Sequence, residues 1–304
     1  MAKTPRPSGT YAPVLMPFKA DLSVDIERLI DYCRWLISQK CKLAIFGTNS
    51  EGTSLCVEER IDIIDQVVEA GISPDDLMPG TGCCAMTDTV KLSAHMARHG
   101  CGGVLMLPPF FYKAINDEGL YRSYSEIVER VGDARLRIYL YHIPPIAQVG
   151  ISLGLIERLT KAYPDTIIGM KDSSGDWSNT REVLEVFPDF DMFCGSESFL
   201  LDTMKLGGKG CISAIANIRP GAIQHLYENW QGNDAAVLQR ELIGFREILT
   251  AQAPIASLKC AISHYSGTPD WNRLRPPLVE LDRATSHGLI KALEAYGFEM
   301  PGFT

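Results

Sequence analysis

Short apolar runs separated by amphipathic helical patterns recur along residues 11–216, at intervals of roughly 25 to 35 residues. This alternation is typical of βα units, in which each parallel strand is followed by a helix. Most runs are apolar on both faces, as strands covered by helices should be. Eight units predict a closed α/β structure, a (β/α)8 TIM barrel, rather than an open sheet. The eight runs are residues 11–18, 43–47, 77–82, 104–108, 138–143, 166–171, 192–195 and 211–216.

The strand pattern stops near residue 230, and only helical patterns follow. Residues 235–251, 255–265 and 282–296 are predicted helices. Pro254 suits a helix start, while Pro276 and Pro277 mark a break. We therefore expect a barrel over residues 10–229 and a C-terminal helical extension over residues 230–304 that packs on it.

Charge and cysteine content argue against several classes of protein. The 304 residues include 37 acidic and 29 basic ones, a net charge of −8, without a Lys or Arg cluster that would suit nucleic acid or an anionic membrane. No segment is apolar for long enough to span a membrane, and the polar start does not look like a signal peptide, so a cytoplasmic protein is expected. The nine cysteines lack Cys-x-x-Cys spacing and are interpreted as reduced thiols.

One lysine, Lys171, closes the sixth apolar run. Burying an ammonium group is costly, and desolvation lowers the pKa of an amine toward the neutral, nucleophilic form. The carboxyl ends of barrel strands also form the active-site face. The residues alone leave two interpretations open: a Schiff-base nucleophile, or a lysine that reaches outward to pair with Asp172.

Five short motifs occur in order over nearly the whole chain. Together they make the sequence similar to the dihydrodipicolinate synthase and N-acetylneuraminate lyase family, the class I pyruvate-dependent aldolases. Each motif alone is weak, and the resemblance rests on all five in register. The matching stretches are Gly47-Thr48-Asn49-Ser50-Glu51-Gly52, Tyr141-His142-Ile143-Pro144, Gly169-Met170-Lys171-Asp172-Ser173-Ser174-Gly175, the group Gly207, Gly210, Ile212-Ser213 and Asn217, and Lys259 with Arg275-Pro276-Pro277-Leu278.

The resemblance implies catalytic roles for three side chains. Lys171 would form an imine with the keto carbon, Tyr141 would carry protons as general base and acid, and Thr48 would join the relay. The residues themselves add that Tyr141 ends the fifth run and that a phenol both donates and accepts. Without the resemblance, a tyrosine that only lines the barrel is the better interpretation.

The loop after the second run is expected to bind the substrate carboxylate. Thr48, Asn49 and Ser50 offer hydroxyl, amide and backbone N–H donors near a turn, although an ordinary capped turn is the alternative. Asn49 and Ser50 stand where the family has a second threonine and a glycine. Asn49 can donate to a carboxylate but cannot relay a proton as a hydroxyl does. Glu51 is expected to be structural.

Two positions depart from the family pattern. Phe111 stands where the family often has a tyrosine that reaches the neighbouring subunit's relay, and it lacks the hydroxyl. Gln148 occupies the region where dihydrodipicolinate synthases carry an arginine for the second substrate's carboxylate. A neutral amide cannot make that charged contact. We expect Gln148 to bind substrate and dihydrodipicolinate synthesis to be disfavoured.

The turn after the seventh run offers further polar groups. In the family's sugar-acid lyases, polar groups in this turn hold substrate hydroxyls, and Ser196, Glu197 and Ser198 could do so here; a helix start capped by Ser196 is an equal alternative. We expect Gly195, Ser196 and Glu197 to bind substrate. By the same resemblance, Ile212 in the eighth run is expected to contact the substrate.

Metal binding is not expected at the one histidine pair of suitable spacing. His95 and His99 lie four residues apart on a predicted helix, which can bring two imidazoles to one metal. That helix should lie outside the barrel, and no His-Glu-x-x-His pattern is present. We therefore predict no metal and no dissociable cofactor.

The sequence thus predicts a lyase that acts on a small 2-keto acid through a Schiff base. A 2-keto-3-deoxy sugar acid or a 4-hydroxy-2-oxo acid would suit the chemistry, with pyruvate as a product. The alternatives are dihydrodipicolinate synthase, a keto-deoxy acid dehydratase, and a non-catalytic keto-acid sensor. The resemblance also implies a homo-oligomer, a tetramer or a dimer.

Overall fold

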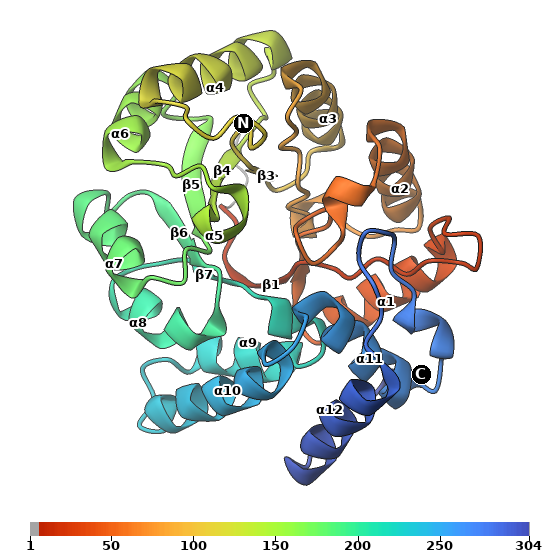
Figure 1. Cartoon of the computed structure of the whole chain (residues 1–304). Helices are drawn as coiled ribbons and strands as arrows, with labels where there is room; N and C mark the ends of the chain where they lie inside the picture. The colour runs from red at the N-terminus through yellow and green to blue at the C-terminus, as the bar shows by residue number, and fades with distance from the viewer. Residues whose placement is uncertain (1–5, 304) are drawn as a thin grey trace.

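Seven parallel strands form one curled sheet at the centre of the molecule, with helices around it (Figure 1). The computed structural model describes residues 6–303. Neighbouring strands follow the order β2-β1-β7-β6-β5-β4-β3, as expected for successive right-handed βα units. The strands are β1 (Gly9–Ala12), β2 (Lys42–Leu43), β3 (Val104–Met106), β4 (Ile138–His142), β5 (Ile167–Asp172), β6 (Asp191–Cys194) and β7 (Gly210–Ile212).

The third apolar run, residues 77–82, is not a regular strand, so the prediction of eight strands is correct for seven runs. The segment still lies between β2 and β3: Met78 N donates to Leu43 O at 2.8 Å, and Leu105 N donates to Pro79 O at 2.9 Å. Only single parallel bridges form on each side. Pro79 has no N–H to donate, which interrupts the ladder. The first run is also shorter than predicted, because β1 ends at Ala12.

Inside the sheet, one side chain from each of the eight segments joins a single buried cluster. The cluster pairs large with small residues, and aromatic edges pack at its centre: the Tyr11 and Tyr139 rings each lie 5.6 Å from the Phe193 ring. This packing makes the interior a filled core rather than a pore. Its members are Tyr11, Ala44, Met78, Leu105, Tyr139, Ile168, Phe193 and Ile212.

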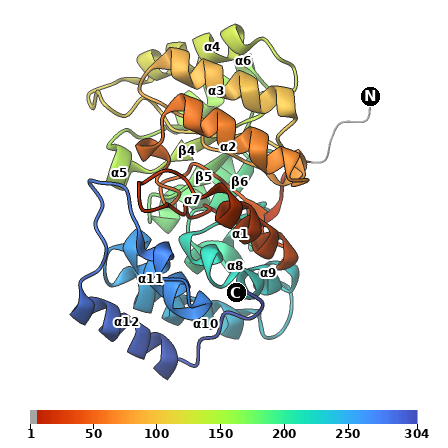
Figure 2. The same ribbon diagram turned by 90° about the vertical axis from the view of Figure 1, so that its right-hand side faces the viewer.

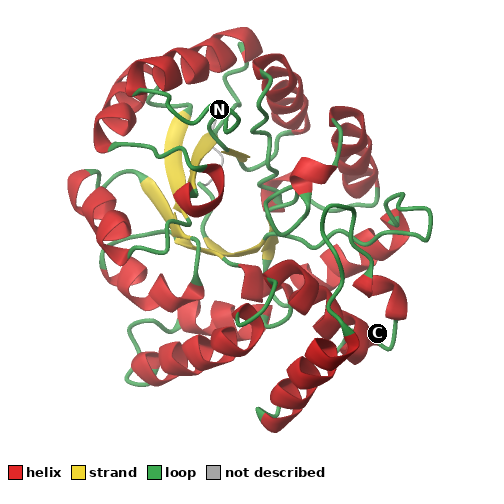
Figure 3. Cartoon of the chain, viewed as in Figure 1, coloured by secondary structure: helices red, strands yellow, loops and turns green. Residues whose placement is uncertain are grey.

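Helices cover the outer face of the sheet (Figure 3). Each buries one apolar stripe; in α1, for example, Leu29, Cys33 and Leu36 face inward as their spacing predicts. The helices of this layer are α1 (Ile26–Ser38), α2 (Val57–Glu69), α3 (Met86–His99), α4 (Asp117–Val131), α6 (Leu153–Ala162), α7 (Trp177–Val186), α8 (Leu200–Lys205) and α9 (Pro220–Glu228). The short helix α5 (Pro144–Ala147) instead lies inside the ring of helices, in front of the sheet in Figure 1.

Three further helices, α10 (Ala235–Thr250), α11 (Pro254–Ser266) and α12 (Arg283–Ala295), gather on one side of the molecule (Figure 2). Helix α10 contacts α9 and the short 3-10 turn Glu197–Phe199, and α11 contacts α12. Pro254 occupies the first turn of α11, as predicted. Over residues 6–303, none of the helices has the length and hydropathy that a bilayer crossing requires.

Candidate active site

Lys171 and Tyr141 lie side by side on neighbouring strands, near the carboxyl ends. They are register partners on β5 and β4, so their side chains leave the sheet in the same direction. Lys171 is only 3% exposed, and its Nζ donates to Tyr141 Oη at 3.2 Å. The same Nζ lies 4.2 Å from the centre of the Tyr141 ring. The lysine amine is therefore held out of bulk water against a phenol.

Asp172 points away from Lys171. Its carboxylate accepts hydrogen bonds from Asn179 Nδ2 at 2.8 Å and Thr180 Oγ1 at 2.6 Å, both on α7. Over the part of the chain that the structure describes, Lys171 forms no ion pair. The alternative interpretation, in which Lys171 pairs with Asp172, is therefore wrong; adjacent strand residues face opposite sides.

Thr48 extends the contact into a chain of three side chains. Its Oγ1 lies 3.0 Å from Tyr141 Oη, so the phenol bridges Thr48 and Lys171. The loop after β2 makes this possible by turning tightly: Gly52 N donates back to Gly47 O at 3.2 Å. Glu51 adopts a left-handed conformation, with φ of 52°, to complete the turn. A lysine, a phenol and a hydroxyl in sequence can move a proton between them.

A cavity of about 200 Å³ opens over this chain at the carboxyl ends of the strands. Its floor holds Lys171, and its wall includes Gly195, where an added Cβ would fall 2.6 Å from Asp172 O. Only glycine therefore lets the end of β6 lie this close to the end of β5. The predicted site residues that line the cavity are Thr48, Asn49, Tyr141, Lys171, Gly195, Ser196 and Ile212. Ser196 lines the cavity and also caps the following turn, because its Oγ accepts from Ser198 N at 3.2 Å; its contact with substrate hydroxyls stays a prediction.

Three residues predicted to bind substrate lie outside this cavity. Ser50 is fully buried beneath the loop, with its N–H donating to Gly47 O at 3.1 Å. Gln148 is exposed at the left-handed end of α5. Glu197 is fully buried below the cavity wall, where it accepts from Ser213 Oγ. Each was placed by its position in a motif, which does not fix the direction of the side chain.

Arg246, which the sequence did not single out, lines the same cavity. It comes from α10, and its Nη1 lies 3.3 Å from Glu197 Oε2. Glu197 is thus a buried anchor for a cation at the cavity wall. Thr250, one turn further along α10, also lines the cavity. No motif signals either residue, because α10 follows the last strand and was expected only to pack.

A buried ion pair supports the loop that carries Thr48. Lys259 Nζ on α11 lies 2.5 Å from Glu51 Oε1, and both side chains have no exposed surface. Arg275 N donates to Glu51 Oε2 at 2.9 Å. Burial lowers the pKa of Lys259, and the nearby Glu51 carboxylate opposes that shift. Glu51 is therefore structural, as predicted, and two residues of the C-terminal motif hold it.

Two other conspicuous groups do not line the cavity at Lys171. His142 is buried, which lowers its pKa, and its Nδ1 accepts from Ile151 N at 3.1 Å; it is a packed, neutral imidazole. Phe111 and Tyr112 are 72% and 74% exposed, outside the cavity. The sequence leads us to expect that Phe110 and Phe111 pack at a subunit interface, and this stays a prediction.

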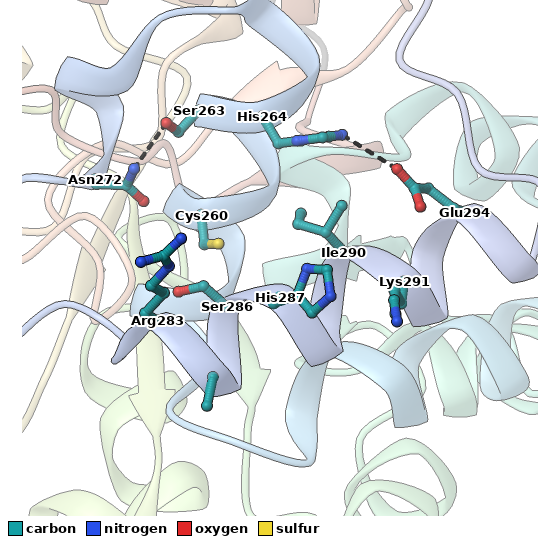
Figure 4. A pocket seen from close by; sticks show the side chains of 11 residues that line it. Cys260, Ser263, His264, Asn272, Arg283, Ser286, His287, Ile290, Lys291 and Glu294 are labelled. Carbon is teal, nitrogen blue, oxygen red and sulfur yellow. Dashed lines mark hydrogen bonds and ion pairs between the residues drawn. The ribbon is translucent and has the colours of Figure 1, made fainter.

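A second hollow, of about 860 Å³, lies between α11 and α12 (Figure 4). His264 and His287 face it from the two helices, and Glu294 closes one end through a 3.6 Å contact with His264. None of the predicted site residues lines it. Of the two cavities, the smaller one is therefore the one that the predicted site residues line.

Comparison with known proteins places the chain in a family. The model of the dihydrodipicolinate synthetase family matches residues 6–296. A DapA-like lyase of uncharacterised activity from Chloroflexus aurantiacus is 30% identical, over 95% of this chain and 96% of its own length. A probable 2-dehydro-3-deoxy-D-pentonate aldolase of Escherichia coli K12, YjhH, is 26% identical, over 95% and 97%.

Comparison with solved structures leads to the same family. A crystal structure of dihydrodipicolinate synthase from Agrobacterium tumefaciens superposes with a TM-score of 0.89 at 29% identity, covering 95% of this chain and 99% of that one. The chain therefore belongs to the dihydrodipicolinate synthetase family and is an enzyme of the lyase class.

Proposed function

We propose that this protein cleaves a small 2-keto acid with a hydroxyl two carbons beyond the keto group, through an imine on Lys171. The observation that carries the proposal is the chain Lys171–Tyr141–Thr48, with contacts of 3.2 and 3.0 Å, on the floor of a cavity of about 200 Å³. A buried amine without an acidic partner is suited to attack a carbonyl carbon.

The reaction would proceed by covalent catalysis. Lys171 Nζ attacks C2, and the Tyr141 phenol gives its proton to the carbinolamine oxygen, which leaves as water and gives a protonated imine. The Tyr141 phenolate then takes the proton from the C4 hydroxyl, the C3–C4 bond breaks, and its electron pair moves onto the imine as an enamine. The C4 fragment leaves as an aldehyde. Protonation at C3 and hydrolysis then release pyruvate and free Lys171.

The near end of the substrate would be held by the loop after β2. Thr48 and Asn49 line the cavity beside Lys171, and their hydroxyl and amide can donate to a carboxylate. The tight turn that aims them is held by the buried Glu51–Lys259 pair. Ser50 would act only through the backbone of that turn.

The far end of the substrate would meet Arg246, Ser196 and Thr250, all on the cavity wall. The Glu197 carboxylate, 3.3 Å from Arg246 Nη1, offsets the charge of the guanidinium while leaving other N–H donors for the cavity. Such a wall suits hydroxyl groups, which favours a 2-keto-3-deoxy sugar acid. The resemblance to the probable pentonate aldolase of E. coli agrees with this substrate class.

A second candidate function is dihydrodipicolinate synthesis. Gln148 lies outside the cavity and offers no cation there, but Arg246 does, and a guanidinium can bind the carboxylate of aspartate semialdehyde. A dehydratase, which would keep the carbon chain whole, would use the same imine and stays an alternative within the proposal. A non-catalytic sensor is disfavoured, because Lys171 is buried beside Tyr141 and has no acidic partner among the residues that the structure describes.

Borohydride trapping tests the central claim. With pyruvate and borohydride, one reduced pyruvyl group should appear on the peptide that holds Lys171, and Lys171→Arg should abolish it, because guanidinium stays protonated. Lys113→Arg, an exposed lysine outside the cavity, is the matched control and should label normally. An adduct on another lysine, or none, refutes the proposal.

A substrate panel then separates the candidates. Turnover is measured with 2-keto-3-deoxy sugar acids and with pyruvate plus aspartate semialdehyde, and products are identified by mass. A sugar acid should have the highest kcat/KM and release pyruvate. The semialdehyde as best substrate would establish the second candidate, and loss of water without pyruvate release would establish a dehydratase.

We propose further that residues 10–229 are a complete (β/α)8 barrel, that residues 77–82 take the place of its third strand, and that residues 230–304 are its helical extension. By resemblance to the family, the chain would work as a cytoplasmic homo-oligomer, a tetramer or a dimer. Size-exclusion chromatography with light scattering checks the assembly, for which a single-chain mass would be the contrary result.

A further inference from the structure

Two histidines and an aspartate converge on the outside of the molecule, between α2 and α3. His95 and His99 lie one turn apart on α3, and their Nε2 atoms are 2.7 and 2.6 Å from the same oxygen, Asp65 Oδ1 on α2. The two rings meet edge to face at 4.8 Å. All three side chains are partly buried, and the two helices lie side by side (Figures 1 and 2).

The sequence predicted no metal at this histidine pair; because the structure adds Asp65 to it, we propose instead that Asp65, His95 and His99 form a site for a divalent transition metal, with zinc as its best match. Their ligand atoms all lie within 4.8 Å of one another. Imidazole nitrogens four residues apart on a helix, joined by a carboxylate, are a donor set that zinc accepts. Zinc bonds of about 2.0–2.2 Å separate neighbouring ligand atoms by roughly 3.3 Å, so small side-chain rotations suffice, and water fills the remaining position.

Charged side chains in and around the cluster should both favour and oppose the binding of a divalent cation. The Asp65 carboxylate supplies a negatively charged oxygen ligand, and both imidazoles already point at one of its oxygens, His95 Nε2 at 2.7 Å and His99 Nε2 at 2.6 Å. Arg98 Nη2 lies 3.2 Å from His95 Nδ1. A metal on Nε2 leaves the proton on Nδ1, so the exposed Arg98 must turn away, and its charge opposes binding.

The site would fasten α2 to α3 rather than take part in catalysis, because its residues lie on helices of the outer layer and none lines the cavity at Lys171. Bound metal should raise the melting temperature and leave turnover unchanged. Helix α3 carries two of the ligands, His95 and His99, and α2 carries the third, Asp65. The spacing in the sequence could therefore indicate the two histidines but not the aspartate, which comes from another helix.

Equilibrium dialysis of chelator-stripped protein against zinc, read by elemental analysis, tests the proposal. One zinc per chain is expected. Asp65→Asn, close in shape to the original, and His99→Ala should each weaken binding by at least about tenfold and remove the zinc-dependent rise in Tm. Arg98→Gln should tighten binding by up to about tenfold, since a repelling charge is removed. Circular dichroism checks that each variant is folded.

Two controls exclude other zinc ligands. His225→Ala removes an exposed histidine of α9 that lies outside the cluster, and Cys56→Ser with Cys84→Ser removes the two exposed thiols. Both should bind zinc as the parent protein does. Zinc retained in Asp65→Asn and His99→Ala, or lost in the thiol variant, overturns the proposal.

Discussion

Replacing Tyr141 by phenylalanine removes one oxygen from the centre of the proposed relay. That oxygen is the only group within hydrogen-bond distance of both Lys171 Nζ, at 3.2 Å, and Thr48 Oγ1, at 3.0 Å, among the bonds that the described residues form. Tyr141 is only 3% exposed, and phenylalanine can keep the packing of its ring. The substitution should therefore separate proton transfer from the shape of the cavity.

The expected effect is large on turnover and small on stability. A positioned general acid–base group typically contributes about 10²- to 10⁴-fold, which is about 2.7–5.4 kcal/mol of barrier, so kcat should fall by that factor. Loss of two hydrogen bonds to neutral or partly solvated groups costs about 1–3 kcal/mol of folding free energy in total. Lys171 stays in place, so the pyruvate adduct should still form under borohydride.

The assay is a double-mutant cycle with Thr48→Val, on the best substrate of the panel. If Thr48 acts through the Tyr141 phenol, its removal should cost much less in the Tyr141→Phe background than in the parent enzyme. Steady-state kcat, single-turnover rates and adduct yield are measured for all four proteins. A Tyr141→Phe enzyme within about tenfold of parent kcat, or two strictly additive losses, would refute the relay and leave Tyr141 as a wall of the cavity.

Four further predictions follow from the same contacts. Lys259→Met should leave the buried Glu51 carboxylate without its partner and lower the unfolding free energy by about 3–5 kcal/mol, measured in urea, and adding Glu51→Gln should restore part of that loss. The hydrogen bonds from Arg275 lower the pKa of Glu59 to about 2, below its unfolded value. The ion pair therefore stabilises the fold fully above about pH 4.3 and loses that contribution as the pH falls toward 2. Glu59→Gln should be less stable than the parent at pH 7, and the difference in unfolding free energy should disappear over that acid range; a difference that persists at low pH would contradict the assignment. EDTA should leave kcat unchanged, because imine formation needs no Lewis acid, and activity restored only by added divalent ion would be the opposing result. Arg246→Gln should lower kcat/KM by about tenfold to a hundredfold while pyruvate labelling of Lys171 is retained, and an unchanged kcat/KM across the panel would remove Arg246 from substrate binding.

Residues at strand ends could be placed from the sequence because a parallel strand fixes both position and direction. Lys171 ends one apolar run and Tyr141 lies near the end of the run before it, and successive runs in a βα series pair as neighbours, so their meeting follows from the pattern and the resemblance. The run at residues 77–82 was predicted as a strand but forms only isolated bridges. Pro79 removes a backbone N–H donor there while the segment stays as apolar as the other runs, so the apolar pattern gives no sign of the interruption.

Residues in turns were placed less well. Gln148 and Glu197 both follow strands closely, yet one is exposed and the other fully buried. Spacing alone gives no period in a turn, so the direction of a side chain there depends on packing that only the folded chain defines. Arg246 was not predicted because it lies on a regular helix, α10, whose apolar periodicity indicates only packing. Nothing in that pattern indicates that this helix also lines the cavity.

The C-terminal helices α10 and α11 do more than pack against the rest of the chain. Arg246 and Thr250 of α10 form part of the cavity wall, and Lys259 of α11 neutralises the carboxylate under the loop that carries Thr48. A chain ending near residue 230 would keep Lys171 and Tyr141 but leave Glu51 buried and unpaired, at a cost that the loop could avoid only by opening. The relay would then lose the position of its last hydroxyl. In the proposed mechanism the C-terminal helices therefore support Thr48 through the Glu51–Lys259 pair, and the boundary near residue 230 marks a change of sequence pattern within one proposed functional unit.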